Sequence, residues 1–167
     1  MTLKDQAKQG IKSKLIERCA LDEGLDPQIL VQAVGAGEVV IPHNRHVELI
    51  RPLAVGKGIS TKVNANIGTS RDHPELEVEL KKLKVGLEAG AHTIMDLSTG
   101  GSIKEIRQAI RDACPVPLGT VPIYQAAVET VERRKRSVCE MDVDDLLRVI
   151  EEHAQEGVDF ITIHCGL

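Results

Sequence analysis

Residues 60–70 read STKVNANIGTS. Apolar side chains alternate there with Asn64 and Asn66, and such alternation predicts a short strand. Asparagine is uncommon in strands, because its amide competes for the hydrogen bonds of the backbone ladder. The Gly-Thr-Ser that follows predicts a turn before a helix. Amides at the carboxyl end of such a strand indicate either substrate contacts in an α/β enzyme or a buried amide ladder that satisfies loop backbone.

The composition predicts one domain with an aliphatic core. The chain has 167 residues, of which 42% are hydrophobic and 1% aromatic, with one Tyr, one Phe and no Trp. The core must therefore be built from Val, Ile, Leu and Ala. The shortage of aromatic rings and the net charge of −4 argue against binding of nucleic acid. The basic run at 133–136 is expected to be a solvated helix end or loop.

Neither a membrane span nor a metal site is expected from the sequence. The chain lacks the run of about 20 apolar residues that a span requires, and its first residues lack a signal-peptide core, so we expect a cytoplasmic protein. The four cysteines are Cys19, Cys114, Cys139 and Cys165. Their spacing fits neither a zinc site nor a CxxC redox pair, which predicts free thiols. His43 and His46 lie in an expected loop, where capping or solvent exposure is favoured over metal binding.

Residues 1–60 are predicted to form an N-terminal α/β extension, distinct from the repeat that follows. The expected elements are an amphipathic helix over 3–20, a second helix from 27 to about 35, a strand over 38–42 and a Gly- and Pro-rich connector over 51–58. Asp26 and Pro27 suit the N-cap and first turn of the second helix.

From residue 61 onward, strands and helices are expected to alternate. Strands are expected over 63–67, 92–97, 118–121 and 158–163, with helices over 74–89, 102–114, 122–134 and 144–155 and a loop over 139–143. Ser102 and Glu105 have the spacing of a capping box. Asn66, Met95 and Tyr124 follow one another at intervals of 29 residues. This spacing predicts a parallel sheet with right-handed crossovers.

Polar side chains gather at the carboxyl ends of the expected strands. They are Asn64, Asn66, Asp96, Ser98, Tyr124 and His164. In a (β/α)8 barrel those ends converge on the face that carries the active site, so together these residues predict a binding site. Taken singly, Asp96 also suits a helix cap, Met95 the core and His164 a buried, hydrogen-bonded position.

The fold class that follows is α/β, with residues 61–167 as the first four βα units of a (β/α)8 TIM-type barrel, only the first half of which is present. An open half barrel would leave a parallel edge and apolar faces exposed. We therefore expect the chain to be the front part of a larger protein, or a subunit that a partner chain completes.

Four long motifs carry a resemblance to a known family. They are KVNANIG at 62–68, MDLSTGG at 95–101, PVPLGTVPIYQ at 115–125 and TIHCG at 162–166. In this order they resemble the phosphomethylpyrimidine synthases, also called thiamine-pyrimidine synthases, over residues 38–167.

The resemblance implies a radical S-adenosylmethionine (SAM) lyase that rearranges 5-aminoimidazole ribotide into 4-amino-5-hydroxymethyl-2-methylpyrimidine phosphate for thiamine biosynthesis. Such an enzyme cleaves SAM with a 4Fe-4S iron-sulfur cluster and binds a further divalent metal, zinc. Carried over by motif, the substrate-binding residues are Asn66, Met95, Tyr124 and His164. Asn64 is then expected to support Asn66. The family also implies a homodimer of the complete protein.

Several parts of the family pattern have no counterpart in residues 1–167. These are the cluster-binding cysteine motif, the Ser-Arg-Gly phosphate contacts and the metal-binding histidines. We therefore expect no catalytic residue and no metal ligand in this chain, and no turnover by this polypeptide alone. Two alternatives stay open: a paralogue that makes 5-hydroxybenzimidazole from the same substrate, and a non-catalytic substrate-binding or assembly subunit completed by a second chain.

Overall fold

A parallel four-stranded sheet lies at the centre of the structure, a computed structural model that describes residues 1–132 and 134–163. In spatial order its strands are β3 (Asn64–Ile67), β4 (Thr93–Asp96), β5 (Leu118–Thr120) and β6 (Phe160–Ile161). All neighbouring strands run parallel. The predicted alternation of strands and helices and the predicted parallel sheet are confirmed, and the described residues contain no closed barrel.

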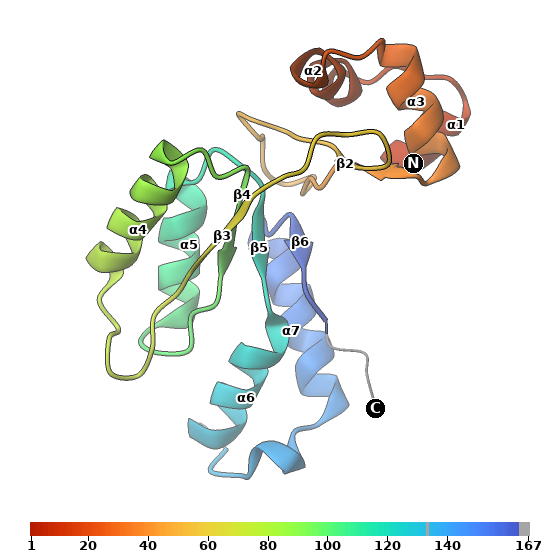
Figure 1. The fold of residues 1–167 in the computed structure, drawn as a ribbon. Helices are drawn as coiled ribbons and strands as arrows, with labels where there is room; N and C mark the ends of the chain where they lie inside the picture. The colour runs from red at the N-terminus through yellow and green to blue at the C-terminus, as the bar shows by residue number, and fades with distance from the viewer. Residues whose placement is uncertain (133, 164–167) are drawn as a thin grey trace.

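Four helices accompany this sheet and supply much of its core. They are α4 (Leu76–Glu88), α5 (Ile103–Ala113), α6 (Pro122–Glu132) and α7 (Val143–Gln155). Figure 1 shows α4 beside α5 against one part of the sheet, and α6 beside α7 at the other end of the strand order. The core that the strands share with α4 and α5 includes Ile67, Leu83, Ile94, Ile106, Ile110 and Leu118. It is aliphatic, as the composition predicted.

Successive residues of each strand face opposite sides of the sheet, so the strand register assigns every side chain to one face. Asn66 pairs with Met95, Met95 with Gly119, and Gly119 with Phe160. We call this row and its side of the sheet the open face, because Asn66 is exposed and Met95 half-buried there. The residues that precede and follow this row point instead toward the helices, and we call that side the covered face.

The N-terminal part forms its own small structure at the amino ends of the strands (Figure 1). It contains α1 (Leu3–Lys8), α2 (Lys14–Glu23), α3 (Pro27–Ala36) and the strands β1 (Val39–Val40) and β2 (Val55–Gly56). β1 and β2 pair antiparallel. A separate hydrophobic cluster, which includes Ile16, Leu30 and Val39, holds these elements together. The division of the chain near residue 60 stays a prediction.

The expected single helix over 3–20 is wrong, because the chain folds there into α1 and α2. Gly10 adopts a left-handed conformation, with φ of 75°, just after α1. Thr2 and Ser13 each begin one of the two helices as an N-cap, and each accepts a hydrogen bond from a backbone amide of the first turn. The predicted N-cap at Asp26 is confirmed by its bond from the Gln28 amide, at 2.7 Å.

Three smaller expectations also differ from the structure. Ser102 makes no side-chain cap bond, because its ψ of 77° is far from the extended backbone of the other N-caps, such as 164° at Thr2, so the predicted capping box is wrong. The connector over 51–58 contains strand β2, and the loop over 139–143 overlaps the 3-10 helix η1 (Val138–Glu140). Backbone pairing and short caps of this kind depend on partners distant in sequence or on exact dihedral angles.

Buried polar contacts attach the N-terminal part to the sheet. The Asn44 side chain donates to the carbonyl oxygens of Ala154 and Val158, at 2.7 and 2.8 Å. Lys62, just before β3, forms a mostly buried ion pair with Glu23 of α2 at 2.5 Å. The loop with His43 and His46 lies beside this attachment. Within residues 1–132 and 134–163, no three His, Cys, Asp or Glu side chains gather as a metal site.

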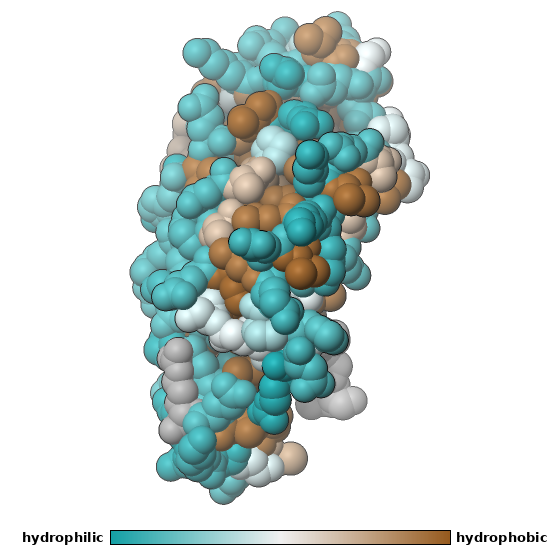
Figure 2. Space-filling model, turned by 90° about the vertical axis from the view of Figure 1, so that its left-hand side faces the viewer, coloured by the Kyte–Doolittle hydropathy of each residue, from teal (hydrophilic) through white to brown (hydrophobic). Residues whose placement is uncertain are grey.

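Hydrophobic side chains gather on the side of the molecule where α4 lies (Figure 2). A shallow apolar groove of about 280 Å³ runs there along α4 and α5, lined mainly by Leu80, Leu83, Leu87 and Ala113. Val85 of the same helix is 64% exposed. The helical layer is thus not fully covered at this edge. None of the helices in the described part of the chain is both long and apolar enough to cross a membrane.

Candidate functional site

A chain of hydrogen bonds leads to Asn66 on the open face. The Thr93 hydroxyl donates to Asn64 Oδ1 at 2.8 Å, and Asn64 Nδ2 donates to Asn66 Oδ1 at 2.7 Å. Asn64 thus orients Asn66, as expected of a supporting residue. No hydrogen bond occupies Asn66 Nδ2 within the described residues, so its two N–H groups are available as donors to a ligand.

Met95 lies next to Asn66 on the neighbouring strand. It is half-buried, whereas its neighbour Ile94 on the covered face is fully buried. The Thr162 hydroxyl lies 4.0 Å from Met95 Sδ. A flexible, polarisable thioether in this position can pack against the ring of a ligand. The structure thus brings two of the predicted binding residues, Asn66 and Met95, side by side.

Tyr124 lies in the first turn of α6, where its amide donates to the Val121 carbonyl at 3.0 Å. Tyr124 is 37% exposed, and this turn directly follows the carboxyl end of β5. It therefore lies at the same end of the sheet as the loops after β3 and β4. His164 and Cys165, the remaining predicted or neighbouring site residues, lie outside the described residues.

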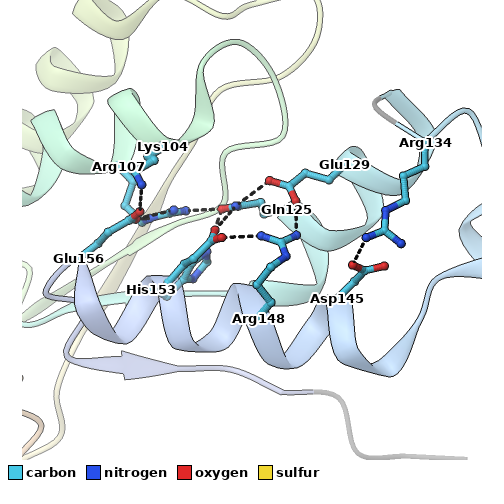
Figure 3. A network of polar contacts seen from close by, with 10 residues as sticks. Lys104, Arg107, Gln125, Glu129, Arg134, Asp145, Arg148, His153 and Glu156 are labelled. Carbon is cyan, nitrogen blue, oxygen red and sulfur yellow. Dashed lines mark hydrogen bonds and ion pairs between the residues drawn. The ribbon is translucent and has the colours of Figure 1, made fainter.

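The next residue, Gln125, anchors this turn in a buried polar network between α5, α6 and α7 (Figure 3). Gln125 Oε1 accepts from Arg107 Nη1 at 2.8 Å and contacts His153 Nε2 at 3.0 Å. Gln125 Nε2 donates to Glu129 and Glu152, at 3.0 and 3.2 Å. All four hydrogen-bonding positions of this amide are thus used, which fixes its orientation and that of the α6 backbone beside Tyr124.

His153 is neutral in this network. Burial, reinforced by the positive charge of Arg107, lowers its pKa from 6.5 to about 3. With a proton on Nε2 it donates to Gln125, and its Nδ1 accepts from the Thr120 hydroxyl at 2.8 Å. This arrangement links the covered face of β5 to α6 and α7.

Asp96 and Ser98 do not belong to the open face, and the prediction that they join its polar group is wrong. Asp96 pairs with Ile67 and Thr120, which turns its side chain toward the helices, where it is 4% exposed. Its carboxylate accepts from the amide and the hydroxyl of Ser98, at 2.9 and 2.5 Å. Burial raises the pKa of Asp96, although the bonds from Ser98 oppose this shift. Asp96 thus stabilises the turn after β4.

The turns after β3 and β4 pack against each other backbone to backbone. A Cβ at Gly68 would lie 2.6 Å from the Leu97 carbonyl carbon, and one at Gly100 would lie 2.1 Å from the Ser70 carbonyl oxygen. The Thr69 amide also donates to Ser98 Oγ at 3.1 Å. Only glycine permits this approach, which keeps the ends of β3 and β4, and so Asn66 and Met95, in a fixed relation.

The described cysteines do not fit the ligand set of an iron-sulfur cluster. Cys19 is buried in the N-terminal cluster and Cys114 in the sheet core, while Cys139 is exposed. Burial raises the pKa of Cys19 to about 12 and also raises that of Cys114, which disfavours the thiolates that cluster iron needs. Cys19 and Cys114 thus lie in two different hydrophobic clusters.

This parallel sheet has an amide and a thioether along one accessible face and a tyrosine just beyond the end of a strand. Such an arrangement is typical of α/β enzymes that bind ligands at the carboxyl ends of their strands. The chain belongs to the Radical SAM ThiC family, whose model matches residues 2–167. The resemblance noted in the sequence is thereby confirmed.

Curated relatives support this membership. Over 167 residues, the chain is 49% identical to the phosphomethylpyrimidine synthase of Syntrophus aciditrophicus (strain SB) and 48% identical to that of Thermoanaerobacter sp. (strain X514). It is 47% identical to phosphomethylpyrimidine synthase 2 of Syntrophotalea carbinolica. Each alignment includes 100% of this chain, which spans 38% to 39% of the length of these relatives.

Proposed function

We propose that the protein carrying this chain is a phosphomethylpyrimidine synthase, which converts 5-aminoimidazole ribotide into 4-amino-5-hydroxymethyl-2-methylpyrimidine phosphate. The observation that carries the proposal is the pairing of Asn66 and Met95 on the open face, with Asn66 Nδ2 left available as a donor. Both residues lie in motifs shared with the family. A planar, polar imidazole needs both a hydrogen-bond donor and an apolar contact, and these two side chains supply them.

In this proposal each site residue has a separate task. Asn66 donates a hydrogen bond to an acceptor atom of the substrate, and Asn64 holds its amide in the required orientation. Met95 packs against the substrate ring. Tyr124 offers a hydroxyl and a ring face from the start of α6, and His164 completes the set on the strength of its motif.

The proposal extends to the rest of the fold. We propose that residues 61–167 form the first half of a (β/α)8 barrel and that residues 1–60 are an appended unit. The support is that β3 and β6 are the edges of the described sheet and that the groove on α4 leaves apolar side chains uncovered. Further βα units beside these two edges would cover the open face and the groove together.

The family relation also implies partners for the complete protein. SAM and a 4Fe-4S cluster follow from the radical SAM family, and zinc, a homodimer and a cytoplasmic location follow from the resemblance. The cluster supplies the reducing electron for SAM cleavage when it is bound. Since the described cysteines do not fit it, and the family's cysteine and histidine motifs have no counterpart in this sequence, we assign its ligands, and those of zinc, to parts of the protein outside residues 1–167.

The direct test is product analysis of the whole protein. It would be incubated anaerobically with 5-aminoimidazole ribotide, SAM and a low-potential reductant, and the product identified by mass spectrometry. We expect the hydroxymethylpyrimidine phosphate, and none when SAM is omitted. A 5-hydroxybenzimidazole product would overturn the proposal in favour of the paralogue. Substrate binding without turnover would indicate a binding or assembly subunit instead.

A further inference from the structure

The open face carries the only phenylalanine of the chain, and its ring lies over a glycine. Phe160 of β6 is the register partner of Gly119 of β5. A Cβ placed on Gly119 would lie 2.3 Å from Phe160 Cε2 and 2.4 Å from Cζ. The far edge of the ring therefore occupies the space that any other side chain at position 119 would need, and the ring leans across β5 toward β4.

The ring is thereby placed in line with the two best-defined site residues. Gly119 pairs with Met95, and Met95 with Asn66, so all four residues form one row across four strands. Phe160 is half-buried. Its ring rests on the backbone of Gly119 and remains partly accessible from the open face.

Glycine at position 119 has no other conformational explanation in the structure. It lies in the middle of the three-residue strand β5 and is not among the glycines with positive φ. Glycine in a strand interior weakens the strand and commonly marks a close approach of another group. Here that group is an aromatic ring, in a chain with one Tyr, one Phe and no Trp.

We propose that Phe160 is a specificity-determining residue that forms the aromatic floor of the substrate pocket. Its ring stacks against the planar heterocycle of the ligand, while Met95 contacts the ring edge and Asn66 donates a hydrogen bond in the heterocycle plane. Because Gly119 has no side chain, the Phe160 ring can lie directly against the β5 backbone, which leaves room above the ring for the ligand. The ligand class is a planar, hydrogen-bonding heterocycle on a ribose phosphate, and this inference rests on the proposed function.

The test compares two ligands that differ only by the heterocycle. Dissociation constants of the whole protein for 5-aminoimidazole ribotide and for ribose 5-phosphate would be measured by calorimetry, in wild type and in Phe160→Leu. Leucine keeps an apolar side chain but removes the ring. We expect the dissociation constant of the ribotide to rise about 10-fold, as expected for one lost aromatic contact, and that of ribose 5-phosphate to stay unchanged.

Controls separate stacking from folding. Phe160→Tyr retains the ring and should retain the affinity, and Ile161→Leu changes the adjacent residue, which faces the helices, and should leave both constants unchanged. Gly119→Ala should push the ring into the pocket and weaken ribotide binding without removing any aromatic contact. Equal weakening of both ligands in Phe160→Leu, or no weakening of either, would overturn the inference. Failure of the wild type to bind the ribotide would instead contradict the proposed function.

Discussion

The two faces of the sheet use polar side chains in opposite ways. On the covered face, Asp96 accepts two hydrogen bonds from Ser98, and Thr120 is bonded to His153. On the open face, the chain of bonds from Thr93 through Asn64 ends at Asn66 Oδ1, and the amide nitrogen of Asn66 has no hydrogen-bond partner among the described residues. Buried polar groups stabilise a fold only when they are satisfied, whereas an accessible donor held in place is suited to binding.

This difference separates the residues that stabilise the fold from the proposed binding residues more sharply than residue type does. Asp96 has a more reactive side chain than its neighbour Met95. It is buried on the covered face, however, and its carboxylate is bonded to Ser98 in the turn after β4. Met95, the residue before it, has no polar group, yet it lies on the open face. A shift of one position along a strand is enough to exchange these roles, because side chains alternate between faces.

The largest expected effect on stability is that of truncating Ile94 on the covered face of β4. It is best measured against truncation of the adjacent Met95 on the open face. Ile94→Ala should lower the free energy of unfolding by about 3 kcal/mol, because it leaves a cavity in a fully buried site, where Ile94 is 0% exposed. Met95→Ala should cost about 1 kcal/mol or less in this chain, because the side chain is only half-buried. Urea denaturation of both variants measures the contrast. Equal losses would show that the two faces are equally buried.

The second prediction concerns the pH dependence of stability, which tests the neutral His153 bonded to the covered face of β5. Because the folded state holds the pKa of His153 at about 3 and the unfolded chain restores it to 6.5, only the unfolded state takes up a proton between these values. The contribution of neutral His153 to the free energy of unfolding is therefore complete above pH 6.5 and is lost as the pH falls. Between pH 7 and pH 5 the free energy of unfolding should decrease by about 2 kcal/mol from this group. Urea denaturation at several pH values measures it.

The matched variant for this titration is His153→Gln, which cannot titrate. Its stability should fall less steeply than that of the wild type between pH 7 and pH 5, whatever its stability at pH 7. Identical pH dependence of the two proteins would contradict the neutral, buried state assigned to His153.

Asn66→Ala and Asn64→Ala test the bonded chain on the open face. In the whole protein, Asn66→Ala should weaken binding of the proposed substrate, 5-aminoimidazole ribotide, about 10-fold, since the proposed donor to the ligand is lost. Asn64→Ala should weaken it about 3-fold, because Asn66 remains but is less well oriented. Calorimetry measures both. A larger effect at Asn64 than at Asn66 would reverse the assigned roles of contact and support.

The smallest expected effect is that of Thr162→Val. The hydroxyl of Thr162 approaches the Met95 sulfur only at 4.0 Å, and sulfur is a weak acceptor. The substitution should change the stability of the chain by about 0.5 kcal/mol or less. A loss several times larger, seen by urea denaturation, would show that the open face depends on this contact for its structure.

Much of this organisation could be predicted from local sequence patterns. The alternation at Asn64 and Asn66 and the equal intervals to Met95 and Tyr124 predicted the strands and their parallel order, whereas Met95 was assigned to the site only through the family resemblance. The break at Gly10 was missed, because a continuous apolar pattern across it resembles one helix. The pairing of β1 with β2 was also missed. It joins Val39 to Gly56, and a long irregular loop separates these two residues in the sequence.

The sequence by itself determined which segments become strands and helices and which family the chain resembles, because these depend on short-range periodicity and on long, distinctive motifs. Only the tertiary structure decided which polar residues serve the fold and which lie on the open face. Asp96 and Asn66 look equivalent along the chain, and the strand register sends them to opposite faces. The ring of Phe160 over Gly119 likewise depends on two strands that are far apart in sequence and meet only when the sheet forms.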